Sequence, residues 1–433
     1  MPRPWSITTR KEPDMAETLD PKAIEKRIMS EPAKTYSKIA VAYSGGLDSS
    51  LGVEIARRKY KAKEVVAVCV DVGQGADEVQ VARDKAKALK IDPIYVDARK
   101  EFCEEWLTKA IRANSDYEGY PVATSMTRQL IGRIVAQEAV KHGCDALMEG
   151  STGKGNDQYR LHNVFTLFAP GRDILAFVRD FDLTRMEERE LSKAWGIPIT
   201  ELVIGGDKTM WCHSIGSGSV MLNDVLPKEV WMWWVPPREA PDKPEEITIG
   251  FERGIPVELN GERMPLGDII DKLNVVGGRN GVGYIDMFED GITCLKSREI
   301  YEAPAAHIIL KLHRDLEQNC LTKDEILFKA MVDQRWAQMV YHGEWFHPLK
   351  RELDAFIEAS QDVVSGSFKV ALYKGNIHIA ERTLGPGSLF APEIRDIKRR
   401  SFDQRWSANA AKIRGLQFEI LAMRDKKVRE AKK

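Results

Sequence analysis

Two segments of the chain combine glycines with small polar side chains in an order that suits anion binding. The first runs from Ala42 to Ser50 and contains the string Ser44-Gly45-Gly46-Leu47-Asp48-Ser49. Glycines lack Cβ atoms, so successive backbone N–H groups can point at one anion, and the N-terminus of a following helix adds positive potential. The segment therefore predicts a phosphate-binding loop. It is not a Walker A loop, because the Gly-Lys-Ser/Thr ending is missing, and it lacks the Gly-x-Gly-x-x-Gly spacing of dinucleotide-binding loops.

The second segment runs from Glu149 to Arg160. Apart from Tyr159 it consists of glycines and polar or charged residues, which would make a poor core and a good site loop.

For the first segment the alternative is a plain glycine turn, with Asp48 and Ser49 in the first turn of a helix. Its position at the end of the first strand of an alternating unit favours the phosphate-binding interpretation.

Both segments need a scaffold that brings the ends of different strands together. An apolar run at Ile39–Tyr43 precedes the first loop, and a helical pattern at 47–60 follows it. Further strands are expected at 64–71, 93–96, 145–148 and 174–178, and further helices at 77–90, 99–113, 127–142 and 183–195. Such alternation implies right-handed crossovers and a parallel sheet covered on both faces. We expect an α/β fold with a doubly wound, mostly parallel sheet at 36–203, after an extension at 1–35.

The pattern changes near residue 204. Residues 205–245 are rich in Gly, Pro and Trp, and hairpin-like pairs follow at 247–251 with 257–260 and at 368–373 with 377–381. Helices are expected near 266–276, 303–317, 323–340 and 351–363. The pattern predicts an α+β domain at 204–392. The charged, helical tail at 393–433 is interpreted as an oligomerisation arm.

The composition excludes several classes of protein. The 433 residues include 64 Lys and Arg against 65 Asp and Glu, so the chain lacks the basic excess of a duplex nucleic-acid binder. It has no apolar run of about 18 residues and no apolar signal segment at its start, which predicts a cytosolic protein without a membrane partner. The six cysteines form no C-x-x-C pair, so neither a disulfide framework nor a zinc site is indicated.

The Ser-Gly-Gly-x-Asp-Ser form of the first loop resembles the PP-loop of the ATP pyrophosphatase superfamily, which cleaves ATP between its α and β phosphates. Other motifs make the resemblance more specific. In order and spacing, the first loop, Ala123–Ser125 with Arg128, the second loop, and the segment 281–305 resemble the argininosuccinate synthase family. The similarity covers residues 38–425.

This resemblance implies a two-step ligation that uses ATP and Mg²⁺ and a protein that forms a homotetramer. The ureido oxygen of citrulline would attack the α-phosphate and expel pyrophosphate, and the amino group of aspartate would then displace AMP to give argininosuccinate. No covalent enzyme intermediate is needed. The protein would therefore contribute positioning and charge stabilisation.

The resemblance also assigns roles by position. The residues that would bind ATP are Ala42, Tyr43, Ser44, Gly45, Gly46, Leu47, Asp48, Ser49, Ser50, Val70 and Gly150. Those that would bind aspartate are Thr152, Asn156 and Asp157. Those that would bind citrulline are Tyr120, Ser125, Asn156, Arg160, Ser214, Glu289 and Tyr301. Arg160 suits an α-carboxylate because its planar fork pairs bidentately, and Glu289 suits an α-ammonium group.

Catalytic roles are expected for Asp48, which would organise the loop or a magnesium ion, and for Arg128 and Asp157. Three positions depart from the family. Glu149 stands where the family has His, Gly205 where it has a Ser that touches citrulline, and His162 where it has Glu. An acid at position 149 would repel a triphosphate unless a magnesium ion or a basic neighbour compensates it.

Two alternatives stay open, and the departures motivate the first of them. One is a paralogous ligase that joins aspartate, or a similar amine, to a different ureido or amide acceptor. The other is a catalytically silent nucleotide-binding protein.

Overall fold

The computed structural model describes residues 19–199, 206–216, 220–396, 398 and 400–432. The chain divides into two compact units, residues 1–388 and residues 389–433. None of the helices within the described residues is long and apolar enough to cross a membrane.

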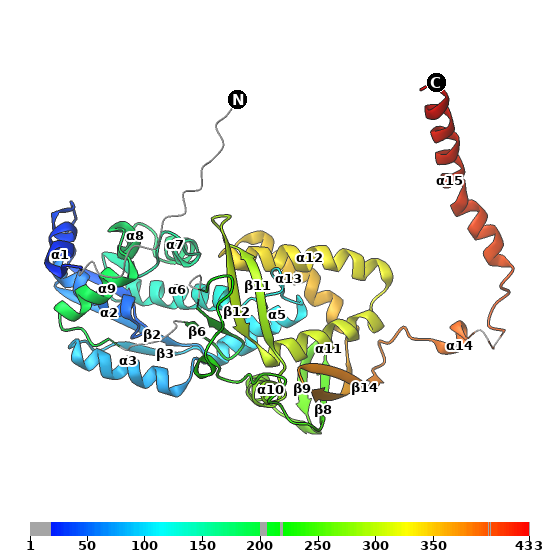
Figure 1. Cartoon of the computed structure of the whole chain (residues 1–433), viewed down its shortest axis with the longest axis horizontal. Helices are drawn as coiled ribbons and strands as arrows, with labels where there is room; N and C mark the ends of the chain where they lie inside the picture. Colours follow the sequence, from blue (N-terminus) through cyan, green and yellow to red (C-terminus); the bar gives the residue numbers. More distant parts are fainter. Residues whose placement is uncertain (1–18, 200–205, 217–219, 397, 399, 433) are drawn as a thin grey trace. The chain divides into compact units, whose positions relative to one another are not determined.

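The first sheet has five parallel strands in the order β3-β2-β1-β4-β5. Two of them, β2 and β3, are labelled in Figure 1. Their bounds are Lys38–Ala42 for β1, Glu64–Asp71 for β2, Ile94–Asp97 for β3, Ala146–Glu149 for β4 and Asp173–Ala176 for β5. The chain builds outward from β1 to β3 and then returns to add β4 on the other side of β1. This order makes the gap between β1 and β4 the topological switch point, where ligands bind at the carboxyl ends of the strands.

Helices cover both faces of this sheet, as the alternation of the sequence predicts. Ile39 and Val41 of β1 belong to one buried cluster and Ala40 to another, because successive side chains of a strand point to opposite faces. The first cluster includes side chains of α1 (Pro21–Ser30), α2 (Leu47–Arg58), α3 (Ala76–Ala88) and α9 (Arg185–Ala194). The second includes side chains of α6 (Thr124–Lys141) and α7 (Asp157–Phe168).

Two expected elements differ in the structure. The helix expected at 99–113 consists of α4 (Arg99–Glu101), a π-helix η1 (Phe102–Leu107) and α5 (Thr108–Arg112). The strand expected at 174–178 ends at Ala176, where the short helix α8 (Phe177–Asp180) begins. The Asp180 carboxylate accepts the Ala176 N–H at 3.0 Å, so the chain turns into the helix there instead of extending the strand.

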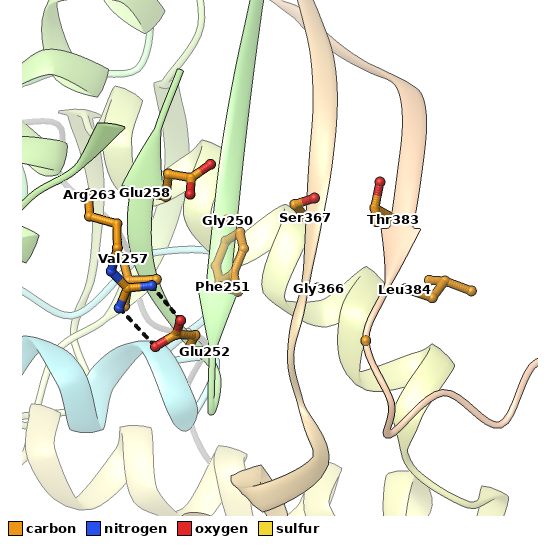
Figure 2. A pocket seen from close by; sticks show the side chains of 11 residues that line it. Gly250, Phe251, Glu252, Val257, Glu258, Arg263, Gly366, Ser367, Thr383 and Leu384 are labelled. Carbon is orange, nitrogen blue, oxygen red and sulfur yellow. Dashed lines mark hydrogen bonds and ion pairs between the residues drawn. The ribbon is translucent and has the colours of Figure 1, made fainter. Parts of the chain in front are cut away.

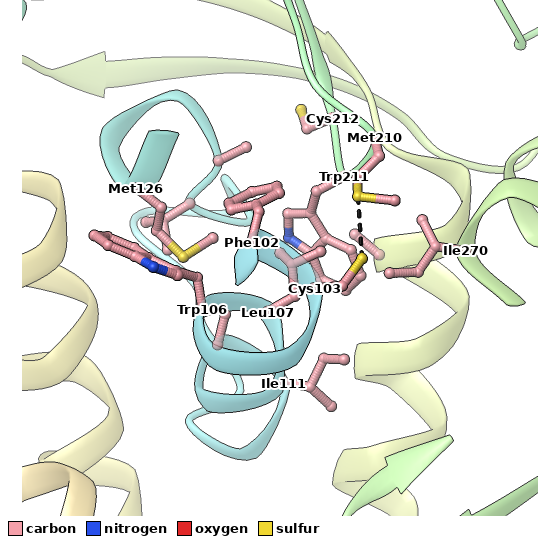
Figure 3. Close-up of a cluster of buried hydrophobic side chains, with 14 of the residues drawn as sticks. Phe102, Cys103, Trp106, Leu107, Ile111, Met126, Met210, Trp211, Cys212 and Ile270 are labelled. Carbon is pink, nitrogen blue, oxygen red and sulfur yellow. Dashed lines mark hydrogen bonds between the residues drawn. The ribbon is translucent and has the colours of Figure 1, made fainter. Parts of the chain in front are cut away.

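The π-helix lies in a dense apolar core beside the second half of the unit. Figure 3 shows side chains of η1, including Phe102 and Cys103, together with Met210, Trp211 and Ile270. The Cys103 thiol lies 3.2 Å from the Met210 sulfur. Ile270 belongs to α10 (Leu266–Arg279), so this core joins the segment that follows the parallel sheet to the helices of that sheet.

Two antiparallel sheets follow. One has the order β10-β9-β8-β13-β14 and contains both expected hairpins. Its strands are β8 (Glu245–Glu252), β9 (Ile255–Leu259), β10 (Glu262–Arg263), β13 (Gly366–Tyr373) and β14 (Asn376–Leu384). The other has the order β11-β12-β7-β6, with β6 (Gly206–Lys208), β7 (His213–Ile215), β11 (Tyr284–Asp290) and β12 (Lys296–Glu302).

Several helices complete the fold. The α-helices are α11 (Pro304–Cys320), α12 (Lys323–Tyr341), α13 (Pro348–Ser360), α14 (Pro392–Arg395) and α15 (Trp406–Glu430). Two short 3₁₀ helices are η2 (Lys228–Val230), before β8, and η3 (Gln361–Val363), directly after α13. The expected tail helix corresponds to α15, which belongs to the second unit and buries no side chain within the described structure.

Candidate active site

The loop after β1 has the geometry of an anion cradle. Gly45 has φ +72°, and a Cβ atom there would lie 2.5 Å from the Cα of Ala82, so only glycine fits. The buried Lys85 of α3 donates from Nζ to the Gly45 carbonyl oxygen at 2.9 Å, which holds the loop from behind. Its pKa is lowered by burial.

The same loop leaves backbone N–H groups exposed, while some of its side chains are buried beneath them. Gly46 is the N-cap of α2 and has no side chain to satisfy the first N–H groups of that helix, which leaves them for an anion. Ser44 and Gly46 are exposed, whereas Tyr43 and Ser50 are buried. The Ser49 hydroxyl accepts the Ser44 N–H at 3.2 Å and fixes the turn.

The loop after β4 lies directly against the loop after β1. Gly150 approaches Asp48 so closely that a Cβ atom at position 150 would lie 2.6 Å from the Asp48 Cβ. The preceding residue, Glu149, is 4% exposed, and its carboxylate accepts the Ser151 N–H. Burial raises the pKa of Glu149 to about 7, against the opposing effect of the Ser151 hydrogen bonds. The two predicted loops therefore meet at the switch point of the sheet.

Four charged side chains alternate in sign beside the second loop. Asp157 accepts from Arg128 Nε at 2.7 Å through one oxygen and from Arg160 Nη1 at 2.8 Å through the other. Arg128 also donates from Nη2 to Asp207 Oδ1 at 2.5 Å. Although burial works in the opposite direction, the two guanidinium groups hold the pKa of Asp157 below its usual range. The arrangement joins α6, α7 and β6 around one carboxylate.

A second group is centred on the buried carboxylate of Glu289. Tyr301 donates its hydroxyl to Glu289 Oε2 at 2.6 Å, and Tyr341 donates to Oε1. Asn156 donates from Nδ2 to the Tyr341 hydroxyl oxygen at 2.8 Å, and Arg160 donates from Nε to the Tyr341 carbonyl oxygen at 2.9 Å. Burial raises the pKa of Glu289, although both tyrosine hydroxyls oppose the shift. Tyr341 thus connects four of the predicted site residues directly or through Glu289.

The remaining predicted acceptor residues lie nearby in the fold. The Tyr120 ring stacks on Tyr301 with centroids 4.4 Å apart, and its hydroxyl accepts the N–H groups of Ala123 and Thr124 at 2.8 Å. Ser125 follows in α6, fully buried, and its Oγ has no hydrogen-bond partner among the described residues. A buried hydroxyl left without a partner is costly, so Ser125 marks a place where a ligand atom would be favourable.

The strand that carries Ser214 is held by contacts with a buried carboxylate. Ser214 pairs with Tyr301 across β7 and β12, and His213 pairs with Glu302. The fully buried Glu302 carboxylate lies 2.6 Å from His213 Nδ1. It also accepts three backbone N–H groups, at 2.7 to 2.9 Å, from the residues Met232, Trp233 and Trp234. This network fixes the register that places Ser214 beside Tyr301.

The sequence analysis names four further positions, two expected in the site and two that depart from the family. Val70 is buried at the end of β2. Thr152 is exposed, and its hydroxyl accepts the Gly155 N–H at 3.2 Å, which closes a turn inside the second loop. His162 is exposed on α7. Gly205 lies outside the residues that the structure describes.

Two hollows are lined by residues outside these loops. One, of about 230 Å³, is a shallow depression on the antiparallel sheet beside the ion pair of Arg263 with Glu252 (Figure 2). The other, of about 1010 Å³, is lined by α11, α12 and the segment that contains Tyr117, whose ring stacks on Tyr341 at 3.8 Å. Within the described residues, no group of three or more His, Cys, Asp or Glu side chains is arranged to hold a metal ion.

Comparison with known proteins agrees with this geometry. Residues 38–198 match the family model of the arginosuccinate synthase N-terminal HUP domain, and residues 205–421 match that of the arginosuccinate synthase C-terminal domain. The chain belongs to the argininosuccinate synthase family. The argininosuccinate synthase of Methanocaldococcus jannaschii is 43% identical over 397 residues, which cover 90% of this chain and 99% of that protein.

Further members of the argininosuccinate synthase family show the same extent of similarity. The protein of Methanopyrus kandleri is 41% identical over 395 residues, covering 90% of this chain and 99% of its own length. That of Pyrococcus furiosus is 41% identical over 384 residues, covering 88% and 93%. A solved NMN synthetase of Francisella tularensis, with a TM-score of 0.29 and 16% identity, covers 42% of this chain and 72% of its own, and it is too distant to support a functional argument.

Sequence reasoning missed several residues of the site. Tyr341 is a single tyrosine at the end of a long helix, and no motif surrounds it. Glu302 lies inside the segment 281–305 that resembles the family, but the residues next to it in the sequence do not indicate that its carboxylate is a centre of hydrogen bonding. Arg185 and Glu188 of α9, which approach Asp48, lie in an ordinary amphipathic helix.

Proposed function

We propose that this chain condenses citrulline with aspartate in an ATP-dependent reaction that yields argininosuccinate, AMP and pyrophosphate, as a step of arginine biosynthesis. The observation that carries the proposal is the meeting of two loops at the switch point of the parallel sheet. Gly150 of the second loop packs on Asp48 of the first, so a nucleotide held by the first loop would lie next to the residues of the second.

The first step would activate the acceptor. The backbone donors around Ser44 and Gly46 would hold the phosphates of ATP, and the ureido oxygen of citrulline would attack the α-phosphorus while pyrophosphate leaves. Tyr120, Ser125 and Ser214 would position the acceptor, and the group around Glu289 would bind its ammonium. The chain offers positioning and charge stabilisation for this step, which requires no protein nucleophile.

The second step would use aspartate as the nucleophile. Thr152, Asn156 and Asp157 would bind it, and its amino group would displace AMP from the activated acceptor. Both oxygens of Asp157 are bonded to guanidinium groups, so Asp157 binds an ammonium only if Arg128 or Arg160 shifts. We propose that Arg128, which also donates to Asp207, leaves Asp157 and turns toward a substrate carboxylate when the aspartate ammonium binds Asp157.

Two further features belong to the proposal. Mg²⁺ would accompany ATP and neutralise charge on the leaving pyrophosphate, and Asp48, the carboxylate of the first loop, would help to hold it. The enzyme would be a homotetramer, with residues 393–433 as the assembly arm, and its cytosolic location stays a prediction. In support, α15 exposes Ile413, Leu416, Ile420 and Met423, whose spacing of three and four residues is typical of a helix seam that packs against another helix.

Pyrophosphate release from Mg-ATP tests the reaction. Release that requires both aspartate and citrulline would support the proposal. Release only with another ureido or amide acceptor would favour the paralogous ligase, which Gly205, Glu149 and His162 motivate. ATP binding without release from any acceptor would favour the silent nucleotide-binding protein.

Asp157→Ala separates the two steps. We expect it to raise the aspartate concentration needed for turnover about tenfold or more, because a charged partner is removed. Citrulline-dependent exchange of labelled pyrophosphate into ATP, measured without aspartate, should stay close to that of the wild type. Asp84→Ala, an exposed aspartate on α3, is the matched control. Loss of ATP binding in Asp157→Ala would contradict this division of the site.

A further inference from the structure

A buried carboxylate lies beside the phosphate loop without a structural explanation. Glu188 is in the first part of α9, and its side chain is 2% exposed. Its Oε2 atom has no hydrogen-bond partner among the described residues. A buried carboxylate oxygen that accepts no hydrogen bond costs stability, so such a group usually serves a ligand or a function.

The neighbouring glutamate shows the contrast. Glu187 is the N3 residue of a capping box with Thr184, accepting its N–H at 2.8 Å, and it also pairs with Arg27 at 2.7 Å. Its role in stabilising α9 is therefore complete. Glu188 instead points toward the N-terminus of α2.

The residue that Glu188 faces is Asp48 of the phosphate loop. Both carboxylates lie against the same guanidinium nitrogen, so they are close to each other. Two carboxylates this close require a proton or a cation between them. Arg185 supplies that cation: it pairs with Asp48, and its Nη1 lies 3.6 Å from Glu188 Oε2. The Arg185 side chain is itself 59% exposed, so solvent reaches it.

We propose that Asp48 and Glu188 together form the binding site for the divalent cation that accompanies ATP, and that Arg185 occupies this site until the cation binds. The proposal rests on the assignment of the first loop to ATP. The donor set fits Mg²⁺, which is commonly held by one or two carboxylates together with substrate phosphate oxygens. Two protein carboxylates without the nucleotide would bind it only weakly.

The displaced Arg185 would then be released beside the polyphosphate. Its guanidinium would gain the phosphate oxygens as partners in place of Asp48, so the cation and the arginine would both neutralise charge on ATP. The exchange makes the two binding events cooperative. Nucleotide affinity should therefore depend on Mg²⁺ through Glu188, although Glu188 itself lies in α9 and outside the phosphate loop.

The first experiment measures this coupling by calorimetry of the full-length protein with α,β-methylene-ATP, with and without Mg²⁺. We expect Mg²⁺ to tighten binding to the wild type roughly tenfold or more, and to tighten binding to Glu188→Gln less than about twofold. Metal-free affinity of the variant should stay equal or rise, because one negative charge is removed. Glu190→Gln, which alters a glutamate paired with Lys193 on the same helix, should behave as the wild type.

The second experiment removes the competing cation. Mn²⁺ alone is titrated into the nucleotide-free protein, and free Mn²⁺ is followed by electron paramagnetic resonance. We expect Arg185→Ala to bind Mn²⁺ at least about threefold more tightly than the wild type, and Arg185→Ala with Glu188→Gln to lose this gain. If Glu188→Gln does not fold, Arg185→Ala by itself decides the question.

Two results would overturn the proposal: full Mg²⁺ dependence in a folded Glu188→Gln, or no gain of Mn²⁺ affinity in Arg185→Ala. Failure of the wild type to bind the nucleotide at all would instead contradict the proposed function. The two failures are therefore distinguishable.

Discussion

Replacing Glu149 with Gln should change how the stability of the protein depends on pH. Glu149 is 4% exposed, and its pKa is raised from 4.5 to about 7 by burial. A carboxyl group with a raised pKa binds its proton more tightly in the folded state than in the unfolded state. The folded wild type therefore loses stability as the pH rises from about 4.5 to about 7, and the loss is complete above that range.

The size of the effect follows from the shift. One pKa unit corresponds to about 1.4 kcal/mol, so between pH 5 and pH 8 the wild type should lose about 2–3 kcal/mol of unfolding free energy that Glu149→Gln does not lose. Glutamine keeps an oxygen that can accept the Ser151 N–H, so the loop keeps its hydrogen bond. The variant should be more stable than the wild type at pH 8 and closer to it at pH 5.

Urea unfolding at pH 5, 6, 7 and 8 measures the difference between the two proteins. The comparison cancels titrations that both share, and Glu190→Gln controls for the removal of an exposed charge. Parallel curves for the wild type and Glu149→Gln across this range would refute the reasoning, because they would show that Glu149 titrates in the folded protein as it does in the unfolded chain.

Three further substitutions or deletions test other parts of the structure. Gly45→Ala places a Cβ atom 2.5 Å from the Ala82 Cα at a positive φ, so ATP affinity measured by calorimetry should fall about tenfold or more; unchanged affinity would exclude the loop as the phosphate site. Tyr341→Phe removes hydrogen bonds to Glu289 and Asn156, each worth about 1 kcal/mol. It should raise the KM for the acceptor about tenfold without changing the Kd for ATP. A change confined to ATP binding would contradict the assignment of the Glu289 group to the acceptor. Deletion of residues 389–433 should give monomers or dimers in light scattering, whereas a persistent tetramer would exclude the arm.

The strands and helices of the parallel sheet were predictable because each carries its own local pattern. The pattern predicts the strand at 64–71 with its exact bounds, because residues 65–70 are apolar and the charged residues Glu64 and Asp71 close this run at its two ends. The sequence analysis does not predict β11 and β12 as strands, because charged residues interrupt the apolar positions of both. Their stability comes from pairing with each other and with β7, which a local pattern does not show.

The site was predictable where a loop carries several special residues and unpredictable where one side chain acts alone. Gly45 and Gly150 belong to glycine-rich strings, so the two loops stood out. The sequence does not reveal that β4 pairs with β1, which is what brings those loops into contact. Tyr341 and Glu188 reach the site through long-range packing, and their neighbours in sequence contain no corresponding signal.

The pairing of β1 with β4 also constrains how the protein folds. Ile39 pairs with Ala146, about 100 residues later in the chain, after β2 and β3 have already been made. A ribosome therefore exposes the first loop well before the second loop exists. During that interval Asp48 has no Gly150 beside it, and the nucleotide half of the site is incomplete. A nucleotide would consequently bind late in folding, and its stabilising effect would act on the finished sheet rather than on its early strands.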